Sequence, residues 1–326
     1  MILVLVEHAE GRPDRLSLEA VSLASRLAGA SGEQLEAALV GGDARGAATA
    51  LAGRDVAVAH VIDDTRLEAF APAAWAASLL QLQGAAMSAS VILAAGSDRG
   101  NEVMAHVGAR LDLPMAANVT EVLGGEPFRV VRQRWAGSLL EESTLDAATK
   151  LLTIAPHAVA VAEPRAGAEP PAVEVFTPTL TDADLAVSVA RTLEPDRTGV
   201  SLADARVVVG GGRGVGSPDA FSELEELAGL LGAAVGVSRV VTSQGWRPHS
   251  MQIGQTGMRI APDLYIACGI SGAIQHIVGA RAAKRILAIN TDADAPIMAV
   301  ADYAVIGDLH QVVPAISAEV RRVKGG

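Results

Sequence analysis

The stretch from Ala261 to Asp308 constrains the fold most, because it contains three short apolar runs that each lead into glycine or polar residues. These runs are Leu264 to Cys268, Ile286 to Ile289 and Tyr303 to Ile306. The first continues through a Gly-Ile-Ser-Gly turn into a segment with helical spacing that carries Gln275 and His276. Apolar runs that alternate with helices predict parallel strands, and parallel sheets bind ligands at the carboxyl ends of their strands. We therefore expect ligand-binding groups along one edge of a sheet.

The N-terminal half shows a similar alternation, which predicts parallel βαβ units. The expected strands lie at 1–6, 35–40, 56–62 and 91–95, and the expected helices at 16–27, 70–87 and 101–111. Shorter runs at 119–123, 128–133, 138–143 and 151–154 predict antiparallel hairpins added to that sheet. The segment 162–181 has four prolines and is expected to be extended and to lie on the surface.

A polar stretch from Thr192 to Ser201 predicts a domain boundary. We expect an N-terminal α/β domain over residues 1–196 and a C-terminal domain over residues 203–326. The second begins with a strand at 206–209, a glycine-rich turn at 210–216 and a helix at 219–231. The predicted fold class is α/β, with two doubly wound, Rossmann-like parallel sheets, of which the first is extended by antiparallel strands.

Charge is distributed unevenly along the chain. The formal net charge is −11, but from Ala203 onward 11 acidic residues balance 11 basic ones, so the excess of acid lies before that point. A phosphorylated ligand is better tolerated by the neutral half. Nucleic-acid binding is not expected, because no basic patch is interleaved with aromatic residues.

Cysteine and histidine usage narrows the chemistry further. The single cysteine, Cys268, excludes a disulfide within the chain and fits a reducing compartment. The seven histidines lack metal-ligand spacing, so no metal site is expected. The opening apolar run is too short to span a membrane, and we expect a bacterial cytoplasmic protein that is not embedded in a membrane.

Three segments of the C-terminal half have the chemistry to bind a ligand. Gly210 to Gly216 follows a strand and carries Arg213, whose guanidinium can grip a phosphate, although a plain connecting loop has the same pattern. Ser238 and Arg239 follow an apolar run and would lie at a strand end, unless Arg239 is simply a solvated surface residue. In Gln252 to Gly257, two glycines bracket Gln-Thr, which suits a flat heterocycle or an ordinary polar turn.

The remaining candidate residues each have a structural alternative. Ser271 can cap the helix that follows it. A lone histidine in an apolar helix, such as His276, more often belongs to the core than to a ligand site. Asn290 and Asp308 stand at strand ends, where asparagine and aspartate also favour turns.

These motifs together resemble the alpha subunit of electron-transfer flavoproteins. The similar segments are Gly211 to Gly214, Val237 to Arg239, Gln252 to Gly257 and Ala261 to His276, and the resemblance covers nearly all of residues 203–326. The N-terminal half is similar more loosely, through Leu3 to His8 and Gly96 to Leu111. The resemblance implies a C-terminal FAD-binding domain and an N-terminal domain that contacts a separate beta subunit.

The resemblance also implies a set of cofactor contacts. Around the pyrophosphate these are Arg213, Ser238, Ser271, Gly272 and Ala273; along the isoalloxazine edge Ile253, Gly254, Gln255 and Thr256; at the adenosine end Asn290, Asp308 and Leu309; and Ile274 and Gln275 complete the set. Arg239, Thr256 and His276 would lie closest to the redox-active ring. A cationic Arg239 and a donor from His276 would favour negative charge on that ring, and the Thr256 hydroxyl would tune proton uptake.

The function implied by the resemblance is that of an electron carrier rather than a classical enzyme. As a heterodimer with the beta subunit, it would carry electrons from flavoprotein dehydrogenases, including those of fatty acid beta-oxidation, to a quinone oxidoreductase or another acceptor. Two alternatives stay open. One is an electron-bifurcating form that oxidises NADH with two FAD, in place of one FAD and an AMP in the beta subunit. The other is a flavin-free nucleotide-binding module.

Overall fold

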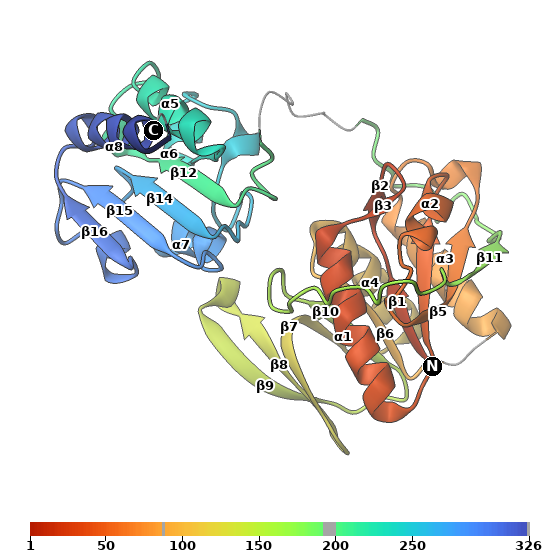
Figure 1. Cartoon of the computed structure of the whole chain (residues 1–326). Helices are drawn as coiled ribbons and strands as arrows, with labels where there is room; N and C mark the ends of the chain where they lie inside the picture. The colour runs from red at the N-terminus through yellow and green to blue at the C-terminus, as the bar shows by residue number, and fades with distance from the viewer. Residues whose placement is uncertain (87–88, 192–199, 325–326) are drawn as a thin grey trace. The chain divides into compact units, whose positions relative to one another are not determined.

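The computed structural model describes residues 1–86, 89–191 and 200–324, and it divides into two compact units (Figure 1). The N-terminal unit covers Met1–Thr192 and the C-terminal unit covers Leu193–Gly326. Most of the boundary predicted at 192–201 lies outside the described residues.

The N-terminal unit is built on a sheet that has nine strands among the described residues, in the order β11-β5-β4-β1-β6-β10-β7-β8-β9. Their bounds are β1 (Ile2–Leu5), β4 (Leu35–Val40), β5 (Val56–Ile62), β6 (Val91–Ala95), β7 (Met115–Gly124), β8 (Phe128–Arg134), β9 (Leu139–Leu145), β10 (Lys150–Ile154) and β11 (Ala172–Phe176). Neighbours from β11 to β7 pair in parallel, whereas β7-β8 and β8-β9 pair antiparallel. The predicted strands and the hairpin extension are therefore present.

Helices cover both faces of this sheet (Figure 1). The helices α1 (Arg15–Ser31) and α2 (Ala44–Thr49) pack on one face, and α3 (Pro72–Ala86) and α4 (Asp98–Leu111) pack on the other. Alternate residues of a strand point to opposite faces, so Val4 joins the first core and Leu5 the second. A short ribbon of β2 (His8–Ala9) and β3 (Arg12–Pro13) follows β1.

One prediction for this unit is wrong, and another is incomplete. The run 151–154 was expected in a hairpin, but β10 is a parallel strand inserted between β6 and β7, where Leu152 pairs with Leu93 and Ala116. It is apolar and buried because both of its faces are covered. The proline-containing segment 162–181 is extended as predicted, but it includes β11, which pairs with β5 and so belongs to the sheet.

Asp184 ties the chain that follows β11 back to the N-terminal unit. Its carboxylate accepts a hydrogen bond from Thr181 Oγ1 at 2.7 Å and another from Arg110 Nη2 at 2.6 Å. Burial alone raises the pKa of Asp184, but the bonds from Thr181 and Arg110 outweigh burial and lower the pKa from 3.8 to about 2.

Replacing Asp184 by asparagine is expected to weaken the acid sensitivity of this unit. Because the native carboxyl has the lower pKa, its contribution to stability is complete above the unfolded value of 3.8 and is lost as pH falls towards about 2. Urea denaturation of the full-length chain at several pH values between about 5 and 2.5 should show a shallower loss for Asp184→Asn than for the wild type. The exposed neighbour Asp182→Asn should keep the wild-type slope, and equal slopes for all three would contradict the assignment.

The sheet of the C-terminal unit has five strands among the described residues, all parallel, in the order β13-β12-β14-β15-β16. Their bounds are β12 (Val207–Gly211), β13 (Ala234–Val237), β14 (Leu264–Cys268), β15 (Ile286–Asn290) and β16 (Tyr303–Ile306). The direction in which strands are added reverses between β12 and β14. In open α/β sheets the crevice at such a reversal is where ligands bind.

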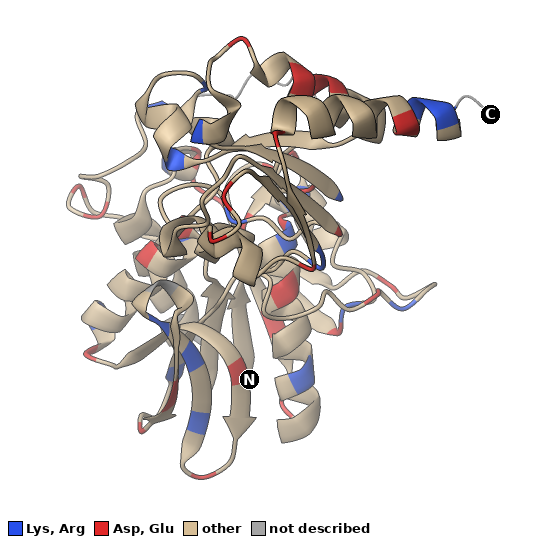
Figure 2. Ribbon diagram, turned by 90° about the vertical axis from the view of Figure 1, so that its left-hand side faces the viewer, with Lys and Arg blue, Asp and Glu red and all other residues tan. Residues whose placement is uncertain are grey.

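Helices also cover both faces of this second sheet (Figure 1). One core contains residues of α5 (Phe221–Leu231), α6 (Arg239–Ser243) and α8 (Leu309–Lys324), and the other contains Ala280 of α7 (Ile274–Ala280). The last turn of α8 is basic (Figure 2), which suits the negative end of the helix dipole. Arg321 in that turn forms an ion pair with Glu226 of α5. The doubly wound arrangement predicted for both units is thus confirmed.

Candidate functional site

The strand order brings the predicted site residues into one row along the carboxyl edge of the C-terminal sheet. Ser238 and Arg239 follow β13, and Arg213 follows β12. The segment 271–276 follows β14, Asn290 ends β15, and Asp308 follows β16. All five strands run in the same direction, so these groups share one edge, as the sequence predicted.

The turn 252–257 is held against two of these strand ends by backbone hydrogen bonds. The Ile253 amide donates to the Val237 carbonyl at 2.9 Å, and the Gln255 amide donates to the Gln275 carbonyl at 2.7 Å. The Gln-Thr turn therefore lies between the end of β13 and the start of α7. Gln255 and Thr256 are exposed there, whereas Ile253 and Gly254 are buried.

Glycines pack the turns after β12 and β14 against each other at the strand reversal. The Gly212 amide donates to the Cys268 carbonyl at 2.9 Å, and the Gly214 amide donates to the Gly269 carbonyl at 3.0 Å. A Cβ at Gly212 would collide with the Gly269 carbonyl. The close approach of the two backbones explains why this turn is rich in glycine.

His276 points into the core of the unit rather than out to solvent. Its Nε2 lies 2.8 Å from the hydroxyl of Tyr265, which is fully buried on β14. Burial lowers the pKa of His276 to about 4, with a weaker opposing influence from the backbone of Ile253, so the ring is neutral at neutral pH. Its Nδ1 atom is buried and makes no well-formed hydrogen bond among the described residues.

A glycine makes room for the tyrosine that contacts His276. Any side chain at Gly210 on β12 would collide with the ring and hydroxyl of Tyr265. Burial raises the pKa of Tyr265 well above its ordinary value of 10, so the phenol keeps its proton. No local sequence signal points to Tyr265, because its contact with His276 depends on packing between β14 and α7.

The structure shows which hydrogen bonds within the protein involve the predicted site residues Ser271, Asn290 and Asp308. The structural alternative for Ser271, a cap on α7, is not found, since the residue at the cap position is Ala273 and no side-chain cap bond is made. Asn290 Nδ2 donates to the Ile270 carbonyl at 3.0 Å, which ties the turn after β14 to the end of β15. Asp308 accepts a bond from the His310 amide at 3.0 Å in the first turn of α8. Asn290 and Asp308 thus behave as turn formers, whatever else they bind.

Two arginines at this edge carry charge that no ion pair among the described residues neutralises. Arg213 and Arg239 are exposed, and neither forms an ion pair within the part of the chain that the structure describes. They follow β12 and β13, whose last residues Gly211 and Val237 are paired. Free guanidinium groups on adjacent strand ends suit an anionic ligand.

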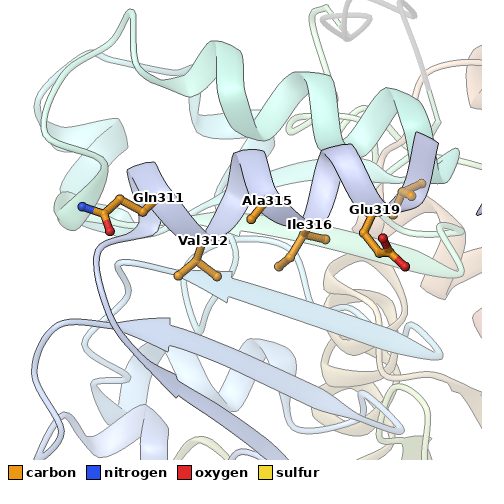
Figure 3. Close-up of a pocket in the computed structure, with 6 residues that line it drawn as sticks. Gln311, Val312, Ala315, Ile316 and Glu319 are labelled. Carbon is orange, nitrogen blue, oxygen red and sulfur yellow. The ribbon is translucent and has the colours of Figure 1, made fainter. Parts of the chain in front are cut away.

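An apolar hollow lies elsewhere on the unit, along α8 (Figure 3). It is lined by Gln311, Val312, Ala315, Ile316, Glu319 and Val320. Val312 and Ile316 point from α8 towards the sheet, and none of the lining residues is a predicted site residue. Within residues 1–86, 89–191 and 200–324, no histidine, cysteine or carboxylate cluster suited to a metal is found, and no helix is long and apolar enough to cross a membrane.

Comparison with known proteins decides the family. Residues 2–181 match the electron transfer flavoprotein domain, and residues 201–281 match the electron transfer flavoprotein FAD-binding domain. The chain is 37% identical to the electron transfer flavoprotein subunit alpha of Mycobacterium leprae, over 99% of both chains. The chain belongs to the electron transfer flavoprotein alpha-subunit family.

Other members of the family are similar over comparable lengths. The probable mitochondrial electron transfer flavoprotein subunit alpha of Caenorhabditis elegans is 37% identical, over 97% of this chain and 92% of its own. Protein FixB of Clostridium saccharobutylicum is 32% identical, over 98% of this chain and 96% of its own. The similarity thus extends through both units of the chain, including the N-terminal unit that the motifs identified only loosely.

The C-terminal unit of this chain is an FAD-binding domain, and FAD is its cofactor, as the resemblance implied. The residues present fit that group. Arg213 offers positive charge for its phosphates, Arg239 offers positive charge for its ring, and the Nδ1 atom of His276 is buried without a well-formed hydrogen bond among the described residues. Ile274 is 69% exposed at the start of α7 and offers an apolar contact. Which of these residues touch FAD stays a prediction.

Proposed function

We propose that this chain is the FAD-holding subunit of an electron carrier. The observation that carries the proposal is the row of predicted contacts on one edge of a sheet within an FAD-binding domain. Bound FAD supplies the redox chemistry, and the chain supplies binding, orientation and electrostatics. A beta subunit completes the carrier as a heterodimer.

Each group at the edge has a physical role in this proposal. Arg213, with Ser238, Ser271 and the backbone of Gly272 and Ala273, holds the pyrophosphate, and Asn290, Asp308 and Leu309 hold the adenosine end. Ile253, Gly254, Gln255 and Thr256 line the flavin edge, next to Ile274 and Gln275. Arg239 keeps a positive charge near the ring. His276 acts as a neutral hydrogen-bonding group and not as a cation, because its pKa of about 4 leaves it uncharged at neutral pH.

The proposed partners follow from the role of a carrier. Flavoprotein dehydrogenases, including those of fatty acid beta-oxidation, deliver electrons to the heterodimer, and a quinone oxidoreductase or another acceptor removes them. We propose that this electron transfer takes place in the bacterial cytoplasm. No direct binding to nucleic acid is part of the proposal.

Co-expression with the neighbouring reading frame tests the proposal. The purified complex should be yellow, with a flavin absorption spectrum, and should release FAD on denaturation. A complex that is colourless and stays so after incubation with FAD would favour the flavin-free nucleotide-binding module. The count of cofactors separates the remaining alternatives, since one FAD with AMP indicates the simple carrier and two FAD indicate the bifurcating form.

Replacing Arg213 by glutamine is expected to weaken FAD binding about 10- to 100-fold, the range for one charge-assisted hydrogen bond. Arg206→Gln is the matched control, because Arg206 precedes the same strand β12 at its opposite end and is 88% exposed beside Asp263. It should leave FAD affinity unchanged. Fluorescence titration of the cofactor-stripped complex measures both variants, and equal affinities would remove Arg213 from the site.

A further inference from the structure

A buried amide connects helix α6 to the turn that carries Thr256. The side chain of Gln252 is only 2% exposed. Thr242 Oγ1 lies 2.6 Å from Gln252 Oε1, and Gln252 Nε2 lies 3.0 Å from Thr256 Oγ1. The three side chains therefore form one continuous line of hydrogen bonds that begins on α6 and ends on the exposed Thr256.

The two distances indicate the direction in which this line donates. Hydroxyl-to-oxygen bonds are most often about 2.7 Å long, whereas bonds from an amide nitrogen to oxygen are about 2.9 to 3.0 Å. The short contact thus suits a Thr242 hydroxyl that donates to the amide oxygen. The longer contact suits an amide N–H that donates to Thr256.

This direction of donation determines which hydrogen bond Thr256 can make with a ligand. A hydroxyl has one proton to donate and two lone pairs that accept. Thr256 uses a lone pair to accept from Gln252, so its own proton stays available for a group outside the line. If the Gln252 amide were flipped by about 180°, its nitrogen would face Thr242 and its oxygen would face Thr256. Thr242 would then donate to the Arg239 carbonyl, 2.9 Å away, and the Thr256 hydroxyl would donate to Gln252, which leaves no proton for a ligand.

The backbone holds Gln252 in place for this task. The Gln252 amide donates to the His249 carbonyl at 2.9 Å, and the Met258 amide donates to the Gln252 carbonyl at 2.7 Å. A Cβ at Gly257 would collide with that same carbonyl, so glycine allows the turn to close over Gln252. The side-chain amide is thereby held at a fixed distance from both threonines.

We propose that Gln252 and Thr242 are positioning residues that make Thr256 a hydrogen-bond donor towards the cofactor. The inference rests on the proposed function, in which FAD binds at this edge and Thr256 lies beside its ring system. The group opposite Thr256 is then an acceptor atom, either a carbonyl oxygen or an unprotonated ring nitrogen. Thr242 acts at a distance, because it touches Gln252 and not the cofactor.

A double-mutant cycle on FAD affinity tests this coupling in the full-length chain, purified with the subunit it assembles with. Thr256→Val should weaken FAD binding about tenfold, and Thr242→Val, which keeps the shape of the side chain, about threefold. In the Thr256→Val background, Thr242→Val should have no further effect. Ser243→Ala, an exposed neighbour on α6, is the control and should leave the affinity unchanged.

A ligand-free measurement separates this inference from the proposed function. In nuclear magnetic resonance spectra without FAD, the side-chain amide signals of Gln252 should shift in Thr242→Val and in Thr256→Val but not in Ser243→Ala. Equal losses of FAD affinity for Thr242→Val in both backgrounds, or no loss in the wild type, would overturn the positioning role. If the wild type binds no FAD, the proposed function fails, and unshifted Gln252 signals in the variants would then reject the hydrogen-bonded line itself.

Discussion

Replacing Gly212 by alanine is expected to destabilise the C-terminal unit by about 3 kcal/mol, at the upper end for an overpacked site. The added methyl would meet the Gly269 carbonyl and the Ile270 Cα, which are backbone atoms that cannot rotate away. The turns after β12 and β14 would have to separate, and FAD affinity should fall with stability. Urea denaturation, with hydrogen exchange to assign the loss to this unit, measures the effect.

The control for this prediction is Gly229→Ala in helix α5. A Cβ at Gly229 would meet nothing within 4 Å, and the position lies inside a helix. Alanine there should stabilise the unit by about 0.5 to 1 kcal/mol, because it is the better helix former. Similar effects for the two variants would mean that the packing of the two turns does not account for the glycine at 212.

Replacing Glu36 by leucine is expected to destabilise the N-terminal unit by about 2 to 3 kcal/mol. Glu36 on β4 and His60 on β5 are both buried, and their side chains meet at 2.6 Å between Oε2 and Nε2. Leucine keeps much of the volume but leaves the imidazole nitrogen without its partner inside the sheet. Urea denaturation of the full-length chain measures the loss.

A second carboxylate on the same imidazole provides the control. Glu174 on β11 lies 3.5 Å from Nδ1 of His60, but its side chain is 65% exposed. Exposed pairs contribute little, so Glu174→Gln should cost less than about 1 kcal/mol. If this variant proves as costly as Glu36→Leu, burial is not what gives the inner pair its value.

The C-terminal unit could be predicted almost completely from sequence because its signals are local. Each strand ends on its own short motif, so the run from Leu264 to Cys268 and the turn at Gly269 predict both a strand and a candidate site. Once the strands are known to be parallel, the common edge follows. FAD was expected from the resemblance to electron-transfer flavoproteins and not from composition and spacing alone, and the family match confirms it.

The errors arose where the outcome depended on partners distant in the chain. The apolar run at 151–154 predicts a strand, but it does not indicate that β6 and β7 are the neighbours of that strand. Because the segment from 162 to 181 is rich in proline, no strand was predicted there. β11 lies in this segment and pairs with β5, which is more than a hundred residues away in the sequence. The line from Thr242 through Gln252 to Thr256 was missed for a different reason, because its members are close in sequence but their contact depends on how the side chains pack.

The position of β11 has a consequence for any shortened form of the N-terminal unit. Proline-rich stretches are natural places to truncate a chain. A fragment that ends at residue 162 would lack β11, and the backbone hydrogen-bonding groups of β5 on that side would be unpaired. An uncovered, apolar outer strand recruits strands from other molecules. A fragment ending before Ala172 should therefore self-associate, whereas one that runs past Asp184 keeps β5 paired with β11.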